Sequence, residues 1–382
     1  MAAFVPMASI SDGFSNSFGY EKRYWKDIKS GFTHFADGDV AVAKISPCLE
    51  NRKSFVARDL PNGIGSGTTE LFVFRSKHIL SDYTLLFFKS NYFISECVAT
   101  FNGVVGQQRA ARNVIEKMTF PIPPAPEQKR IVEAVKELFG RIDEIENAKL
   151  SAKANLDAAK SRILELAIHG KLVPQDPSDE PAIELLKRIN PDFRPSDNLH
   201  YEGGVPKGWL LCTLGEVSNY GRCVSVLADE IDDSAWVLEL EDIEKDSGRL
   251  LHQIEKKERI ISGIRHRFKK GQILYSKLRT YLNKVLVAPD DGFCTTEIIP
   301  ITPIDGIDPQ YLNLVLRSPY FLKYTARCGY GVKMPRLGTN DARKAIIPIP
   351  PIEEQHRIVQ KTIALFSVLE IIISLNNIQI AE

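Results

Sequence analysis

Apolar residues recur at alternating spacings of four and three along a central stretch of the chain. From Ile131 to Leu166 only Lys149 interrupts this stripe, which is typical of a coiled-coil seam. At a rise of about 1.5 Å per residue the seam spans roughly 50 Å. Gly170 follows, and glycine commonly ends a helix. The pattern predicts one long helix whose balanced charges form a solvated face.

The two flanks of this helix have a different pattern. Residues 1–120 alternate short β-branched and aromatic runs, such as Val40–Ala43 and Leu71–Phe74, with turns rich in Gly, Asn and Ser. A helical stretch is expected near Ser81 to Val98. Residues 204–347 have the same mixture, and a short helix is expected at Ala182 to Ile189. Both flanks are therefore predicted to be α+β.

A proline-rich motif occurs twice. Pro121–Val132 is followed 227 positions later by Pro348–Val359, and both copies run from prolines into Glu-Gln-x-Arg-Ile-Val. Prolines and Glu favour the first turn of a helix, so a second helix is expected from Ile352. Two helices that begin with one motif can pair antiparallel. That pairing would relate the two flanks by a pseudo-twofold axis.

Matches in the same order along both flanks indicate an internal duplication. They join Ile10 to Ile243, Phe35 to Phe268, Gly38 to Gly271, Lys44 to Lys277, Glu70 to Glu297, Ser90 to Ser318, Arg109 to Arg336 and Asn113 to Asn340. The opening of the second flank, from Val205 to Asp233, has no counterpart in the first. The second helix also ends earlier than the first, so the chain looks clipped at both ends relative to two full repeats.

Composition narrows the class of protein. The chain has 382 residues, 44% hydrophobic and 25% charged, with a net charge of +1, so a nucleic-acid contact must rely on local basic patches. Six scattered cysteines without a C-x-x-C pair indicate idle thiols in a reducing compartment. No apolar run is long enough to span a membrane, and no signal-peptide pattern is present. A cytoplasmic location without membrane contact is expected.

Catalytic motifs are not convincing anywhere in the sequence. The Gly63–Gly67 segment is better interpreted as a plain loop than as a phosphate cradle, because no Lys-led helix follows it. Neither proline pair has the residues of a base-methylation motif. Five acidic residues, Glu239, Glu241, Asp242, Glu244 and Asp246, could hold a nuclease metal, but a solvated loop is the favoured interpretation. We expect a non-catalytic protein without a cofactor or metal.

Basic residues gather in two stretches of the second flank, 259–284 and 323–344, with tyrosines between them. Such clusters can simply be a soluble surface, but their recurrence in a duplicated unit favours DNA binding. Arg suits guanine edges and Gln suits adenine edges. The candidate DNA contacts are Lys44, Arg52, Gln107, Arg109, Arg265, Arg267, Lys277, Arg279, Tyr281, Lys333 and Arg336. Lys44 and Lys277 could instead support the fold.

These features together resemble the specificity subunit of a type I restriction-modification system. The resemblance rests on the two proline-rich motifs, on Gly170–Pro177 with Asp179-Glu-Pro181, on Pro206–Trp209 and on Leu214–Glu216. It implies two α/β target-recognition domains separated by long conserved helices that form an antiparallel coiled coil. The implied limits are residues 1–122 for the clipped first domain, 123–170 for the first helix, 171–203 for a linker, 204–349 for the second domain and 350–382 for the clipped second helix.

The resemblance also implies a function. Each recognition domain would read one half of a bipartite site in double-stranded DNA, and the helices would set the spacer. The helices would also dock two modification (methyltransferase) subunits, and restriction subunits, which are ATP-dependent translocases and nucleases, would join. The alternative is a clipped, inactive recombination cassette or coiled-coil scaffold without its own DNA specificity. An enzyme with its own nuclease site is the third possibility.

Overall fold

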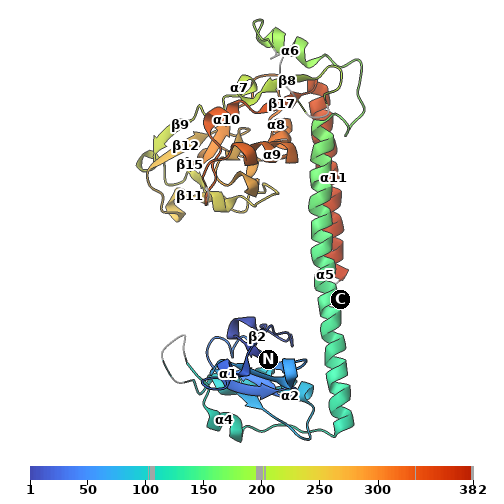
Figure 1. Ribbon diagram of the computed structural model, residues 1–382. Coiled ribbons are helices and arrows are strands. Elements are labelled where there is room, and N and C mark those ends of the chain that lie inside the picture. The colour runs from blue at the N-terminus through green and yellow to red at the C-terminus, as the bar shows by residue number, and fades with distance from the viewer. Residues whose placement is uncertain (102, 104–107, 195–200, 202–203, 332, 380–382) are drawn as a thin grey trace. The chain divides into compact units, whose positions relative to one another are not determined.

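The computed structural model describes residues 1–101, 103, 108–194, 201, 204–331 and 333–379, with side chains described as far as residue 372. The chain divides into two compact units, Met1–Lys149 and Leu150–Glu382, and the division falls within the long helix α5 (Ala125–Ile168). Each unit combines sheets and helices (Figure 1). The predicted α+β class is therefore confirmed.

The described residues of the first unit form two sheets. In one, β1 is parallel to β6, and β2 and β3 are antiparallel to their neighbours. The first sheet has the order β2 (Glu21–Arg23), β1 (Ala2–Val5), β6 (Ile64–Gly67) and β3 (Thr33–Ala36), and the second, antiparallel sheet has the order β5 (Ser54–Val56), β4 (Val40–Ala43) and β7 (Leu71–Phe74). The helices before α5 are α1 (Trp25–Ile28), α2 (Ser81–Phe88), α3 (Asn91–Val98) and α4 (Arg112–Lys117).

The second unit repeats this plan with additions. Its larger sheet has the order β11 (Ile254–Glu255), β10 (Trp236–Leu238), β15 (Gly292–Thr295), β12 (Ile264–Phe268) and β9 (Val224–Leu227). Its second sheet has the order β14 (Val285–Val287), β13 (Ile273–Ser276) and β16 (Ile298–Ile301), and β8 (Leu210–Thr213) pairs with β17 (Ile346–Ile349). Its helices besides α5 are α6 (Ala182–Ile189), α7 (Leu214–Val217), α8 (Pro309–Arg317), α9 (Pro319–Cys328), α10 (Thr339–Arg343) and α11 (Ile352–Gln379).

The predicted duplication is visible strand by strand. The parallel pair β1 and β6 matches the parallel pair β10 and β15, and β5-β4-β7 matches β14-β13-β16. Ser90 and Ser318 cap the matching helices α3 and α9, because each hydroxyl accepts from the backbone of the phenylalanine three residues on. In the first unit this cap divides the single helical stretch predicted at 81–98 into two helices.

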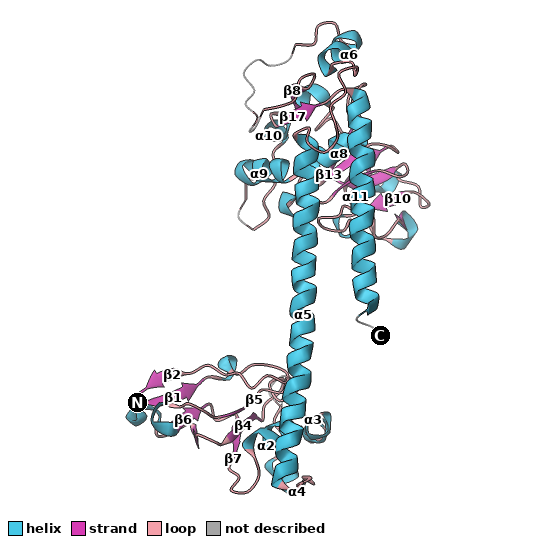
Figure 2. Ribbon diagram, turned by 90° about the vertical axis from the view of Figure 1, so that its right-hand side faces the viewer, coloured by secondary structure: helices cyan, strands magenta, loops and turns pink. Residues whose placement is uncertain are grey.

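Helices α5 and α11 run side by side within the second unit (Figure 2). Lys160 lies 3.2 Å from Glu370 and over the ring of Phe366, whereas Gln175 and Asp179, which follow α5, contact the first turns of α11. As the chain advances along α5 and the residues after it, its contacts therefore move toward the start of α11. The two helices pair in antiparallel orientation, as predicted. The pseudo-twofold relation and the domain limits stay predictions.

The end of α5 has a steric cause. Gly170 has a φ of +64°, and a Cβ there would lie 2.3 Å from the Cγ of Pro206.

Along α5 the predicted seam is partly buried near its C-terminal end but exposed at Leu138, Ile142 and Ile145, which are 60%, 47% and 46% exposed. None of the described helices is both long and apolar enough to cross a membrane.

Candidate nucleic-acid interface

In the second unit, the loop between β13 and β14 lies against the segment that leads into α10. The backbone N–H of Arg279 donates to the carbonyl of Pro335 at 2.7 Å, and that of Leu337 donates to Lys277 at 2.9 Å. We call residues 277–284, 329–331 and 333–337 the second loop pair. It brings together five of the predicted DNA contacts, Lys277, Arg279, Tyr281, Lys333 and Arg336.

The first unit builds the same arrangement between β4 and β5. Ser46 N–H donates to the carbonyl of Gln108 at 2.8 Å, and Ala110 N–H donates to Lys44 at 2.9 Å. Residues 44–53 and 108–110 form the first loop pair, which contains Lys44, Arg52 and Arg109. The predicted contact Gln107 lies outside the described residues.

An ion pair joins each loop pair to a neighbouring strand end. Arg109 Nη2 lies 2.7 Å from Glu70 Oε1, and Arg336 Nη2 lies 3.0 Å from Glu297 Oε1. Each glutamate also accepts a backbone hydrogen bond. The N–H of Lys44 donates to the carbonyl of Glu70, and the N–H of Lys277 donates to that of Glu297, both at 3.0 Å. Hydrogen bonds from Arg109 lower the pKa of Glu70. The two arginines selected from the sequence are therefore oriented by carboxylates.

A cationic side chain supports the back of each loop pair. Lys89, which is fully buried, donates to the carbonyls of Gly13 at 2.8 Å and Arg52 at 2.9 Å. Arg52 in turn donates from Nε to the carbonyl of Lys89 at 3.0 Å. Burial lowers the pKa of Lys89 to about 8. Arg52 thus holds the loop through the protein backbone, a role that sequence reasoning did not assign to it.

The second unit makes the equivalent contacts with different residues. Arg317 Nη2 donates to the carbonyl of Asp246 at 2.9 Å, and Asn283 Nδ2 donates to the carbonyl of Arg317 at 3.0 Å. Burial lowers the pKa of Arg317. Arg52 and Asn283 both have positive φ, 60° and 50°. The side-chain contact therefore fixes a strained part of each loop.

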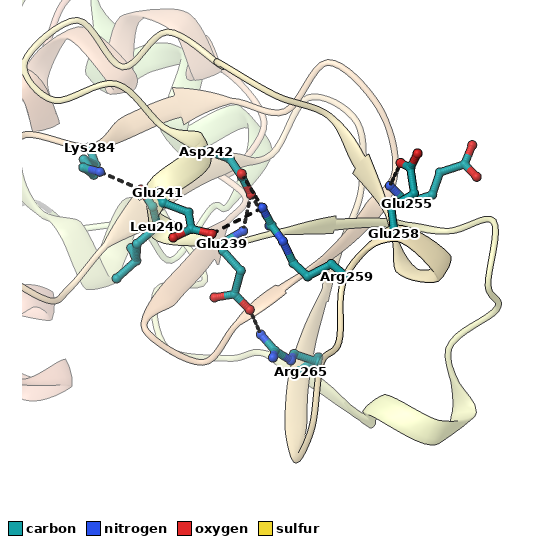
Figure 3. A network of polar contacts seen from close by, with 9 residues as sticks. All are labelled: Glu239, Leu240, Glu241, Asp242, Glu255, Glu258, Arg259, Arg265 and Lys284. Atoms are coloured by element: carbon teal, nitrogen blue, oxygen red, sulfur yellow. Dashed lines mark hydrogen bonds and ion pairs between the residues drawn. The ribbon is translucent and has the colours of Figure 1, made fainter.

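The other two predicted contacts lie apart from the loop pair, on strand β12. Arg265 forms an ion pair with Glu239, and its side chain is only 12% exposed, whereas Arg267 is exposed. Figure 3 shows Arg265 and Arg259 directed toward the acidic segment, residues 239–242. Arg259 Nη2 lies 2.7 Å from Asp242 Oδ1. The basic stretch 259–284 is therefore partly neutralised from within the unit.

The acidic segment itself requires a correction. Asp242 is 1% exposed and lies in a 3-10 turn, Leu240–Asp242, so its carboxylate does not belong to a solvated loop. Its carboxylate accepts from the backbone of Glu239 as well as from Arg259. Across the described residues, no three His, Cys, Asp or Glu side chains are grouped so that they could hold a metal ion. Burial raises the pKa of the thiols of Cys97 and Cys212 to about 11 and about 12.

Several side chains of the second loop pair are exposed. Tyr281 is 58% exposed, and Lys333 is exposed as well. Sequence reasoning did not select Tyr330 and Met334, which are 60% and 49% exposed on the same segment as Lys333. The available signal was the position of these two residues inside a glycine-containing basic loop. Cations suit phosphates, and aromatic or thioether groups suit bases.

Comparisons with known proteins agree on one family. A family model described as "Type I restriction modification DNA specificity domain" matches residues 66–155 and 243–381. The EcoAI specificity subunit of Escherichia coli is 36% identical over an alignment of 276 residues, and the match covers 57% of this chain and 47% of the relative. The EcoEI specificity subunit of the same organism is 34% identical over an alignment of 273 residues, and the match covers 56% of this chain and 46% of the relative. The chain thus spans about half the length of these relatives.

Two solved structures share the fold. The HsdS subunit from Thermoanaerobacter tengcongensis has a TM-score of 0.56 at 17% identity and covers 100% of this chain and 85% of its own. A chain reported under "Structural basis underlying complex assembly and conformational transition of the type I R-M system" has a TM-score of 0.64 at 18% identity, covering 98% and 87%. The family model matches more than half of the chain, with one matched range in each of the two repeats. This chain therefore belongs to the type I restriction modification DNA specificity family.

Proposed function

We propose that this chain is the DNA-recognition subunit of a type I restriction-modification complex and that it binds a bipartite target. The main support is the duplicated loop pair. Both units hold two loops together with the same backbone hydrogen bonds and the same Glu–Arg ion pair. The residues around this frame differ between the units. A shared frame with different surface residues suits two modules that read different DNA sequences.

Each loop pair would then contact one half-site. Lys277 and Lys333 supply charge for phosphates, and Tyr281, Tyr330 and Met334 present apolar surface to bases. The Glu297–Arg336 pair would keep one arginine in a fixed orientation, which favours selective over general contacts. In the first unit, Lys44 and Arg109 would act in the same way.

The helices would set the distance between half-sites and dock the other subunits. By family membership we expect two modification subunits that methylate adenine and restriction subunits that use ATP, all in the cytoplasm. The chain itself would contribute binding without catalysis. Helix α5 has 44 residues, a length that exceeds one turn of B-DNA (~34–36 Å) at about 1.5 Å per residue.

Methylation mapping tests this function. A host that expresses the full chain with the modification subunit of the same system should carry methylated adenine in a motif of two defined halves and an undefined spacer. A chain with Tyr281→Ala and Lys333→Ala, both exposed positions, should degrade one half and leave the other defined. Methylation without sequence preference, or a complex that forms but methylates nothing, would support the scaffold alternative instead.

A further inference from the structure

A cleft in the second unit lies between the end of α5 and the start of α9. It has a volume of about 430 Å³, and both helices contribute to its lining. The charged or titratable side chains of the lining are Arg162, Glu165, His169, Lys171 and Lys323. Arg162, Lys171 and Lys323 carry positive charge, whereas Glu165 is the one acidic residue among these. The cleft therefore has an excess of positive charge.

Aromatic rings hold the two walls of the cleft together. Tyr201 is 4% exposed, and the centroid of its ring lies 5.1 Å from that of His169 and 4.8 Å from that of Tyr320. Its hydroxyl donates to the carbonyl of Ile168 at 3.0 Å. Tyr320 lies in the first turn of α9. The end of α5 and the start of α9 are therefore fixed relative to each other, and the cations that they carry face one cleft.

The positive charge continues along α9 to the second loop pair. Arg327 lies one helical turn after Lys323, a spacing that places both on one face, and both residues are exposed. One segment of the loop pair begins at Gly329, directly after the helix. The sequence adds no negative charge to this path, because no Asp or Glu occurs between Asp308 and Asp341. One positively charged surface therefore joins the cleft to the loop pair.

The matching helix of the first unit lacks these cations. The serine caps of α3 and α9 align the two helices residue by residue. Lys323 then corresponds to Ser95. Arg327 corresponds to Ala99, which follows the end of α3, and α3 itself contains Glu96 but no Lys or Arg. The shared fold therefore does not require the positive charge, which belongs to the second unit alone.

We propose that a flanking surface, formed by Arg162, Lys171, Lys323 and Arg327, binds the sugar-phosphate backbone of double-stranded DNA next to the second half-site. This inference rests on the proposed function. Helix α9 has ten residues, and its length of ~15 Å corresponds to roughly four base pairs of B-DNA. The cations would contact phosphates over this distance without reading the bases. The first half-site would lack such contacts.

DNA suits the flanking surface better than an acidic protein segment does. The surface is continuous with the second loop pair, which is proposed to contact DNA. The backbone of a duplex held at the loop pair carries its phosphates onward past the neighbouring cations. An acidic protein segment at the same place would be repelled by that duplex. Charge and continuity therefore favour one ligand for both surfaces.

The salt dependence of DNA binding tests the proposal on the full chain in complex with the modification subunit of the same system. The probe is a duplex that carries the methylated target. Lys323→Ala with Arg327→Ala should make the slope of the logarithm of the binding constant against the logarithm of the salt concentration shallower by about two. Discrimination between the correct and a scrambled second half-site should not change. The matched control, Lys187→Ala with Arg188→Ala, removes the same charge from exposed positions on α6 and should keep the wild-type slope.

Hydroxyl-radical footprinting of the same complexes locates the contacts. The second half-site is identified as the half that Tyr281→Ala with Lys333→Ala degrades. The wild-type complex should protect the backbone over roughly four base pairs next to this half, and Lys323→Ala with Arg327→Ala should remove that protection alone. Unchanged melting temperatures would show that the variants fold.

The outcomes separate this inference from the proposed function. If the wild-type complex prefers its target but the α9 variant keeps the wild-type slope and footprint, the inference is overturned and the function stands. A complex that does not bind DNA would overturn both. If the α9 variant loses the modification subunit while the chain alone binds DNA as before, the flanking surface docks a protein, and the inference is again overturned.

Discussion

The two units support their loop pairs with different residues in equivalent contacts. Lys89 reaches the carbonyl of Gly13, and Arg317 reaches that of Asp246. Arg52 on one loop and Asn283 on the other return a hydrogen bond to the backbone of the cation. What the duplication preserves here is a loop carbonyl that accepts a hydrogen bond from a cationic side chain, and either lysine or arginine can donate it.

The proline-rich motifs show the reverse relation, because the same residues lie in different surroundings. Glu354 is buried, and burial raises its pKa, whereas Glu127 is exposed. Arg357 pairs with Asp179, and its counterpart Arg130 is exposed. Identity of sequence therefore does not predict burial when the covering residues come from elsewhere in the chain.

The largest effect should come from removing a buried cation. Lys89→Met leaves two loop carbonyls without their donor and should destabilise the first unit by roughly 2–3 kcal/mol. Urea unfolding of the full chain would measure this, and Lys117→Met, at an exposed position on α4, is the matched control. Arg317→Met should lower the stability of the second unit instead. Equal stability of Lys89→Met and the control would show that the buried cation contributes nothing.

The pH dependence of unfolding sharpens the same test. Burial lowers the pKa of Lys89 to about 8 in the folded chain, and an unfolded lysine has a pKa of about 10.4. Between these values the unfolded chain binds more protons, so this lysine makes stability rise with pH. Lys89→Met should lose that rise. An identical slope in the variant would mean that Lys89 is not the titrating group.

Much of the scaffold could be predicted because its signals are local. The proline-rich motifs predicted both helix starts within a few residues, and the short helix predicted at 182–189 agrees with α6. Strands β4 and β7 follow from their β-branched and aromatic runs. The break between α2 and α3 was missed, because Ser90 can be an interior residue or a cap and only the structure decides.

The surface proposed to bind DNA was less predictable, because its charges interact with residues that lie far apart in the sequence. A count along 259–284 finds only cations, yet Arg259 and Arg265 are paired with Asp242 and Glu239. The partners lie some twenty residues apart in the sequence, and the two acidic residues lie at the turn Leu240–Asp242. Composition therefore overstated the free positive charge on β12, while the repeat matched Lys277 to Lys44 and Arg336 to Arg109 without predicting that the two lie together.

A smaller effect should distinguish the two motif arginines. Arg357→Ala leaves Asp179, whose side chain is 8% exposed, without its ion-pair partner, and should lower the stability of the second unit by about 1 kcal/mol after allowance for solvent screening. Arg130→Ala removes an exposed side chain and should cause no measurable change in chemical unfolding. Equal losses would show that the first motif is covered by something as strongly bound as the linker.

The smallest effect should come from the ion pairs of the loop pairs. Glu297→Gln keeps the shape of the side chain but removes the negative charge that neutralises Arg336. Sequence-independent binding to DNA should then depend more on salt, and the slope of the logarithm of the binding constant against the logarithm of the salt concentration should become steeper by about one. The looser arginine should also reduce discrimination between the correct and a scrambled second half-site by roughly threefold to tenfold. Competition binding at two salt concentrations measures both quantities. Glu70→Gln should act on the first half-site alone, and Glu116→Gln, at a position exposed on α4, is the control. If Glu297→Gln and Glu70→Gln weakened the same half-site, the two loop pairs would not be separate readers.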